Sequence, residues 1–227
     1  MSKKIHRFFV PLLRNENTVT ITDTHTLHHM VRVLCLEVGE YIEVVEEGTV
    51  ITIAITQLSS KQLEGTIIKE QAGIQPKRKI TLALAVIKKD MFELVVSKAS
   101  ELGVSRIIPL ITARTIKKEL RLERLRDIAR EAIEQSEQTH LPIIEKPQTL
   151  KEVLEISTPE VWIGVPHTTT LLHPNSNDVL IIIGPEGGFT DEEVAHARNA
   201  HAREFGLTSS VLKAETAAII ATYQALG

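Results

Sequence analysis

Hydrophobic and polar residues follow two different patterns along the chain, and the change falls near residue 72. In the first part, short runs rich in β-branched residues are separated by turn residues, which is typical of a small barrel. Strands are expected at residues 19–21, 41–45, 49–56 and 63–68, and one short helix at 24–34. We therefore expect residues 1–72 to form a small β-barrel domain.

The second part alternates strands and helices after a polar, proline-containing stretch at residues 71–79, which we interpret as a linker. Strands are expected at residues 80–87, 104–111, 161–165, 179–183 and 203–207, and helices at 90–102, 119–138, 190–202 and 215–226. Such alternation predicts an α/β domain in which helices cover a parallel sheet. This domain is expected to span residues 73–227.

A glycine-rich loop, residues 184–188, joins the apolar run 179–183 to the next helix. Thr190 is a good N-cap for that helix, and Glu193 completes a capping box. Strand, glycine loop and helix N-terminus together are the usual ligand site of an open α/β sheet. The loop lacks the lysine of a P-loop, and the acidic Glu186 argues against a phosphate ligand. We expect a small-molecule loop that does not bind phosphate; the alternative is a tight turn with no ligand.

Composition narrows the classes of protein that the chain can represent. Its 227 residues are 43% hydrophobic and 24% charged, as in an ordinary soluble globular protein. The single cysteine, Cys35, excludes an internal disulfide and a Cys-rich zinc site. No apolar run approaches the roughly 20 residues that span a membrane, so we expect a cytoplasmic protein without a membrane partner. The net charge of −3 means that a polyanion would have to meet a local basic patch.

Two segments could supply such a patch. The segment 114–130 is rich in arginine and lysine, and phosphate binding and a solvated helix face explain it equally well. The helix expected at 24–34 carries His25, His28, His29 and Arg32. No carboxylate or cysteine has matching spacing, so a nucleic-acid contact is favoured over a metal site.

The chain ends in a strongly apolar helix, residues 215–226, and a polar loop at residues 208–217 leads into it. A helix apolar on most sides is buried, either in the core or against a second subunit. The polar loop could hold a ligand against the glycine loop, or it could be a plain connection.

Motifs spread along nearly the whole chain identify a family. They are His6-Arg7-Phe8-Phe9, Arg32-Val33-Leu34, residues 98–104, residues 131–136 followed by Pro142, residues 183–188 and residues 211–217. Together and in this order they resemble the ribosomal RNA small subunit methyltransferase E family of the SPOUT superfamily. The chain departs from the family pattern at Cys35, Gln138, His140 and Lys213, where the family usually has arginine.

The resemblance implies a fold, a reaction and an assembly. The fold would be a PUA-like β-barrel followed by a SPOUT-type α/β domain tied in a trefoil knot. The reaction would be methyl transfer from S-adenosylmethionine to N3 of a uridine in 16S rRNA, by a homodimer. The implied cofactor-binding residues are Pro166, Ile183, Gly184, Pro185, Glu186, Gly187, Gly188, Leu207, Val211, Leu212, Thr216 and Ala217. The residues expected to bind RNA are His6, Arg7, His29, Arg32, Arg114, Lys117, Lys118 and Arg121.

This reaction sets requirements for catalytic side chains. Uridine N3 is a poor nucleophile until it loses its proton, so nearby positive charge or a base is needed. Lys213 is the candidate for the charge, and Glu186 or Glu215 for the base; each glutamate could instead shape its loop by accepting backbone N–H bonds. Methyl transfer needs positioning and no metal. The alternatives are a SPOUT methyltransferase acting on tRNA and a non-catalytic RNA-binding protein with a decayed site.

Overall fold

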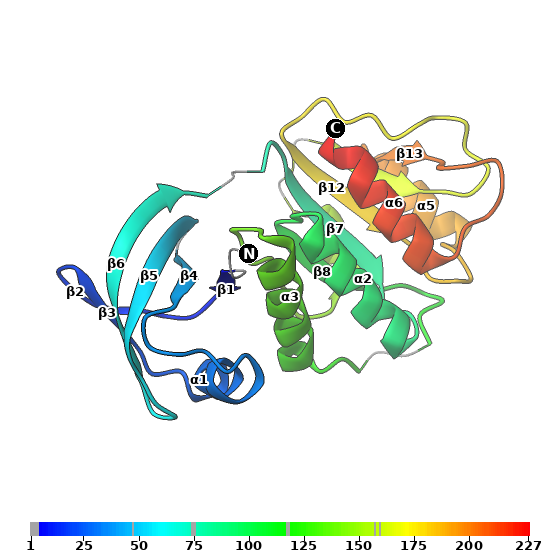
Figure 1. The fold of residues 1–227 in the computed structure, drawn as a ribbon. Helices are drawn as coiled ribbons and strands as arrows, with labels where there is room; N and C mark the ends of the chain where they lie inside the picture. The colour runs from blue at the N-terminus through cyan, green and yellow to red at the C-terminus, as the bar shows by residue number, and fades with distance from the viewer. Residues whose placement is uncertain (1–4, 47, 74–75, 117–118, 157, 159) are drawn as a thin grey trace. The chain divides into compact units, whose positions relative to one another are not determined.

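The computed structural model describes residues 5–46, 48–73, 76–116, 119–156, 158 and 160–227 (Figure 1). The chain divides into two compact units. The first comprises Met1–Gln75 and Ile133–His140, and the second comprises Pro76–Ala132 and Leu141–Gly227. The first unit therefore adds a segment from the middle of the chain to the residues expected to form the first domain. The predicted linker is shorter than expected, because strands continue to Ala72 and resume at Lys79.

The first unit contains a sheet with the strand order β1-β4-β5-β6-β3-β2. Its strands are β1 His6–Phe8, β2 Leu13–Asn15, β3 Thr18–Ile21, β4 Tyr41–Glu46, β5 Thr49–Leu58 and β6 Leu63–Ala72. Neighbours are antiparallel except β1 and β4, which are parallel. The four strands expected here are present as β3, β4, β5 and β6, each with bounds within a few residues of the prediction. β1 and β2 were not expected, because three residues are too few to show a period.

The expected helix at 24–34 is present in two pieces. α1, Thr24–His28, begins at Asp23, whose carboxylate accepts from the backbone N–H of Thr26 at 2.7 Å. A π-helical turn, His29–Val33, continues it. Leu27 and Met30 are fully buried and pack with the sheet residues into the core of this unit.

The second unit contains a parallel sheet, as predicted. Its strand order is β10-β8-β7-β12-β11-β13, and β9 also pairs with β8. Its strands are β7 Lys79–Ala85, β8 Arg106–Ile111, β9 Ile143–Ile144, β10 Gln148–Thr149, β11 Glu160–Gly164, β12 Asp178–Ile183 and β13 Arg203–Phe205. Every pairing in it is parallel. All the carboxyl ends of these strands therefore lie along one edge of the sheet.

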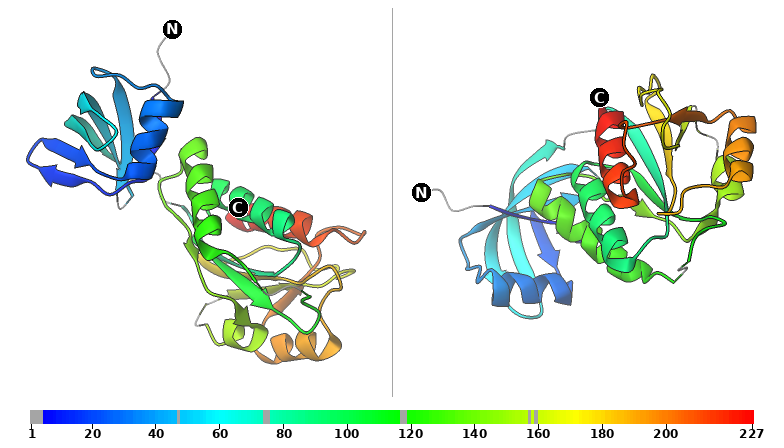
Figure 2. Two further views of the ribbon diagram at one scale, coloured as in Figure 1. Left: turned by 90° about the horizontal axis from the view of Figure 1, so that it is seen from below. Right: turned by 90° about the vertical axis from the view of Figure 1, so that its right-hand side faces the viewer.

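Helices cover both faces of this sheet (Figure 2). They are α2 Lys89–Glu101, the part of α3 Leu122–Ser136 that precedes Ile133, α4 Leu150–Leu154, α5 Asp191–Asn199 and α6 Ala214–Leu226. Successive residues of β12 point to opposite faces. Ile181 packs with Phe92 of α2 and Ala218 of α6 in one core cluster, whereas Ile182 packs with Ala197 of α5 in another. This explains why the whole of residues 179–183 is apolar.

No helix in the described part of the chain combines the length and the apolar character needed to cross a bilayer.

Candidate functional site

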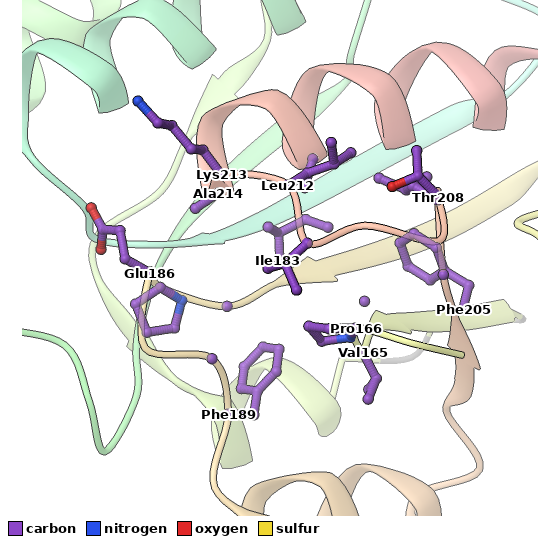
Figure 3. A pocket seen from close by; sticks show the side chains of 18 of the residues that line it. Val165, Pro166, Ile183, Glu186, Phe189, Phe205, Thr208, Leu212, Lys213 and Ala214 are labelled. Atoms are coloured by element: carbon purple, nitrogen blue, oxygen red, sulfur yellow. The ribbon is translucent and has the colours of Figure 1, made fainter. Parts of the chain in front are cut away.

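A cavity of about 300 Å³ lies at the carboxyl ends of β11, β12 and β13 (Figure 3). The loops that follow these strands line it together with the first turn of α6. Because the three strands are neighbours in the sheet, segments far apart in sequence meet here. This is the position at which open α/β sheets bind ligands.

Most residues of the implied cofactor set line this cavity. They are Pro166, Ile183, Gly184, Pro185, Glu186, Gly188, Leu207, Val211, Leu212 and Ala217, and Lys213 from the catalytic set lines it as well. The glycine loop and the polar loop before α6 thus lie on one cavity, as the sequence suggested.

Gly187, Glu215 and Thr216 are outside the lining, as far as the described residues define it. A Cβ on Gly187 would point toward Arg114 and would lie 3.4 Å from Cδ of the arginine. Residues three positions apart share a helix face, and the lining takes Ala214 and Ala217 from α6. Glu215 and Thr216 lie between them in sequence and therefore face elsewhere.

Other lining residues were not in the implied cofactor set. Thr208, Ser210 and Ala214 belong to the polar loop that was expected to face the glycine loop, whereas Gly164, Val165, Phe189, Phe205 and Gly206 were not expected. Val165 is the last residue of the strand predicted at 161–165, so a rule that takes the carboxyl end of each parallel strand would have found it. Phe205 lies in the middle of the strand predicted at 203–207, and only the structure shows that β13 ends there. Phe189 needed the structure, because its ring lies against Gly184, where a Cβ would be 3.0 Å from Cε2 of the ring.

The shape of the glycine loop depends on Gly188. Its φ is +70°, a left-handed conformation that favours glycine. Its N–H donates to the carbonyl of Pro185 at 2.8 Å, which closes a tight turn. The predicted capping box follows: Glu193 Oε2 accepts from Thr190 N at 2.9 Å, and Thr190 Oγ1 accepts from Glu193 N at 3.2 Å.

The cavity wall is mainly apolar side chains and loop backbone. Two charged side chains, those of Glu186 and Lys213, lie at one end of it, away from Phe205 and Thr208 (Figure 3). Such a cavity suits a small molecule with an apolar ring system, whose polar groups bond to the backbone. The carboxylate of Glu186 and the ammonium group of Lys213 can bind a second ligand that lies next to the cavity, or they can exchange a proton with it.

A buried carboxylate anchors the loop between β11 and β12, which begins at the cavity. Glu160 Oε2 accepts from the backbone N–H groups of Asn175 and Ser176, both at 2.8 Å. Its Oε1 accepts from Trp162 Nε1 at 3.1 Å and from Arg203 Nη1 at 3.0 Å. Arg203 also lies over the Trp162 ring, 5.5 Å from its centroid. β11, β13 and the returning loop are therefore joined at one carboxylate.

This environment predicts an acid-sensitive contribution to stability. Burial acts to raise the pKa of Glu160, but the hydrogen bonds and the charge of Arg203 outweigh it and hold the pKa below its ordinary value of 4.5. The unfolded chain then binds the proton more readily, so the stabilisation is complete above pH 4.5 and is lost as the pH falls through the folded pKa. Glu160→Gln should lower the free energy of unfolding by about 2 kcal/mol at pH 7.

Urea unfolding between pH 7 and pH 3 measures this effect. The difference between wild type and Glu160→Gln should shrink in acid, whereas Glu204→Gln, which removes the partner of exposed Arg198, should have little effect at any pH. A Glu160→Gln difference that stays constant over this range would contradict the assignment.

The residues expected to bind RNA have different environments. Arg7 donates to Glu43 Oε2 at 3.0 and 2.8 Å and to the carbonyl of Glu137, so its guanidinium is held within the first unit. His29 lies edge-on to Phe8, with ring centroids 6.5 Å apart, and His6 is half-buried in β1. Arg32 and Arg121 are exposed. RNA binding by these residues stays a prediction.

Arg114 is also exposed, but its side chain donates to the carbonyls of Gly187 and Phe189 in the glycine loop. Lys117 and Lys118 lie outside the described residues. In the part of the chain that is described, no group of three or more His, Cys, Asp and Glu side chains could hold a metal ion.

Comparisons of sequence and structure identify proteins that are similar to this chain. A family model described as an RNA methyltransferase domain matches residues 75–225. A protein from Rickettsia conorii named ribosomal RNA small subunit methyltransferase E is 32% identical, over 97% of this chain and 95% of its own. A protein of the same name from Synechocystis is 33% identical, over 92% of this chain and 73% of its own.

Solved structures resemble the whole chain. A putative methyltransferase from Legionella pneumophila, in complex with the bound cofactor SAM, has a TM-score of 0.87 and 29% identity, covering 97% of this chain and 96% of that one. A ribosomal RNA small subunit methyltransferase E from Neisseria gonorrhoeae, bound to S-adenosyl methionine, has a TM-score of 0.87 and 26% identity, with coverage of 96% and 95%.

Proposed function

Because the chain belongs to the ribosomal RNA small subunit methyltransferase E family, we propose that it transfers a methyl group from S-adenosylmethionine to N3 of a uridine in 16S rRNA. The observation that carries the proposal is the cavity at the ends of β11, β12 and β13. Its volume and apolar lining fit an adenosine moiety, and two similar proteins have been solved with this cofactor bound. An rRNA substrate also implies a cytoplasmic enzyme.

The cofactor would be held by the loop backbone and the apolar wall. Ile183, Leu207 and Leu212 supply apolar surface, and Gly184 and Gly188 allow close approach of the backbone. S-adenosylmethionine supplies a methyl group on a sulfonium, which is transferred without a metal. The chain's task is then to align the uracil with that methyl group and to exclude water.

The charged end of the cavity would act on the uracil. The ammonium group of Lys213 would stabilise the negative charge that forms as N3 loses its proton, and the carboxylate of Glu186 would accept that proton. Glu215 is the weaker candidate for the base, because it lies outside the cavity lining in the described part of the chain. The uracil must leave its stack to reach either group.

The finer architecture is part of the same proposal. Residues 1–72, which make up most of the first unit, would form a PUA-like barrel that contacts RNA, and residues 73–227 would form the SPOUT-type methyltransferase domain. The second unit would be tied in a trefoil knot and would assemble as a homodimer.

Mass spectrometry of 16S rRNA tests the proposal. We expect rRNA from a strain that lacks the protein to miss one N3-methyluridine, and purified protein with S-adenosylmethionine to restore it on isolated small subunits. Lys213→Ala should bind the cofactor but restore at least about tenfold less per unit time. Unchanged 16S rRNA with a change in tRNA would favour the tRNA alternative, and a protein that binds RNA but no cofactor would favour the non-catalytic one.

A further inference from the structure

Arg114 joins two parts of the second unit that are not neighbours in the sheet. It lies on the turn after β8, and its Nη1 donates to the carbonyls of Gly187 at 2.5 Å and Phe189 at 3.2 Å. These carbonyls belong to the loop after β12, and β7 lies between β8 and β12. One exposed side chain therefore spans an intervening strand to bond to the glycine loop.

The effect of these bonds is to fix two peptide planes of the loop. In a trans peptide the C=O and N–H groups point in opposite directions. In the Gly187–Gly188 peptide, the carbonyl bonds to Arg114 and the N–H bonds to the carbonyl of Pro185 at 2.8 Å. In the Phe189–Thr190 peptide, the carbonyl bonds to Arg114 and the N–H bonds to Glu193 Oε2. Each plane is held at both edges and cannot rotate freely.

The turn that carries Arg114 is itself fixed. Thr112 N donates to Thr115 Oγ1 at 2.9 Å, Thr115 N donates to the carbonyl of Thr112 at 3.1 Å, and both threonines are buried. A second bond joins this turn to the glycine loop, because Ala113 N donates to Glu193 Oε1 at 2.8 Å. Arg114 is thus presented to the loop by a rigid support.

The fixed planes determine one wall of the cavity. The peptide plane at Phe189 orients its side chain, which lies against Gly184, and both residues line the cavity. We infer that Arg114 is a positioning residue that holds the glycine loop in its cofactor-binding shape; this inference rests on the proposed function. The basic segment 114–130 then divides into Arg114, which acts on the cofactor loop, and residues farther along that remain candidates for RNA.

Variants of the full chain distinguish two possible roles of Arg114: holding the glycine loop in its cofactor-binding shape and contacting an RNA phosphate. Arg114→Ala should raise the dissociation constant for S-adenosylmethionine about tenfold, the cost of one charge-assisted hydrogen bond. Arg114→Lys should have an intermediate effect, because an ammonium group keeps the charge but loses the planar fork. The KM for S-adenosylmethionine should rise in parallel, with kcat at saturating cofactor changed less than about threefold. Arg198→Ala, an exposed arginine at the end of α5, is the matched control and should leave cofactor affinity unchanged.

The affinity for 16S rRNA, measured without cofactor at several salt concentrations, tests the alternative that Arg114 contacts a phosphate. The slope of log affinity against log salt should be the same for Arg114→Ala as for wild type. An unchanged cofactor affinity together with a slope reduced by about 1 would overturn the inference and make Arg114 a phosphate contact. If Arg114→Ala does not fold, Arg114→Lys decides by the same two measurements. Wild-type protein that binds no S-adenosylmethionine would overturn the proposed function itself, and the inference with it.

Discussion

Gly206→Ala should abolish cofactor binding and cost the second unit about 4 kcal/mol or more of stability. Gly206 follows β13, and a Cβ at this position would lie 2.0 Å from the carbonyl oxygen of Thr168 and 3.0 Å from its carbon. Both are backbone atoms, so no side-chain rotation can relieve the overlap. The loop after β11 would have to move away from the end of β13.

That movement would open the cavity. Gly206 N donates to the carbonyl of Thr170 at 2.9 Å, and Val165 N donates to the carbonyl of Phe205 at the same distance. These bonds hold together two loops that line the cavity, the one after β11 and the one after β13. Displacement of Thr168 would break the hydrogen bond between Gly206 and the nearby Thr170 and would strain the one between Val165 and Phe205. Cofactor affinity and folding stability should therefore fall together.

Calorimetric titration with S-adenosylmethionine and urea unfolding measure the two effects. Gly187→Ala adds the same methyl group in the glycine loop, where it would meet only side-chain atoms of Arg114, at the ordinary contact distances of 3.4 Å for Cδ and 3.7 Å for Cβ. We expect its affinity to stay within about threefold of wild type, a free-energy change below one hydrogen bond. Tolerance at position 206 combined with loss of binding at position 187 would contradict the geometry of both loops.

The contrast between these glycines shows which parts of the site could be predicted. The glycine loop at 184–188 was predicted because its strand, turn and capping box are adjacent in sequence. The contact of Gly206 with Thr168 depends on β11 and β13 being neighbours in the sheet, which is not their order in the chain. No local pattern encodes that order, so Gly206 was absent from the implied cofactor set, whereas Gly187 was included in it although it lies outside the described cavity lining.

The same reason applies to Arg114 and to the shortest strands. Arg114 belongs to a basic segment, and its contact with the glycine loop depends on the order β8-β7-β12. β9 and β10 are each two residues long and form only because β8 is available to pair with them. By contrast, the parallel sheet was predictable, because long apolar runs alternating with amphipathic helices permit few other folds.

The closing helix supports the proposed homodimer. Its buried face is made of small residues, with Ala218, Ala221 and Ala225 fully buried against the core. On the remaining surface, Ile220 is half-buried and Tyr223 is 68% exposed. An apolar helix with one covered face leaves a second apolar face that needs cover, and a second copy of the chain related by a two-fold axis would supply it.

Ile220→Asp should therefore separate the subunits and abolish methyl transfer. A carboxylate in an apolar interface would be desolvated without a partner, which should weaken dimerisation about thirtyfold or more. Lys213 and Leu212 precede α6 and line the cavity, so loss of the partner should also loosen that loop. Sedimentation velocity at micromolar concentration, with a methyl-transfer assay on the same sample, measures both effects.

Ile143→Asp is the matched control, since Ile143 is 55% exposed on β9, which pairs with β8. It adds the same charge at an apolar surface position outside α6, and it should leave the protein dimeric and active. Two results would refute the proposal: wild-type protein that sediments as an active monomer, or Ile220→Asp that stays dimeric. A monomeric Ile220→Asp variant with normal methyl transfer would be consistent with a wild-type homodimer. It would show that the partner subunit does not support the cofactor loop.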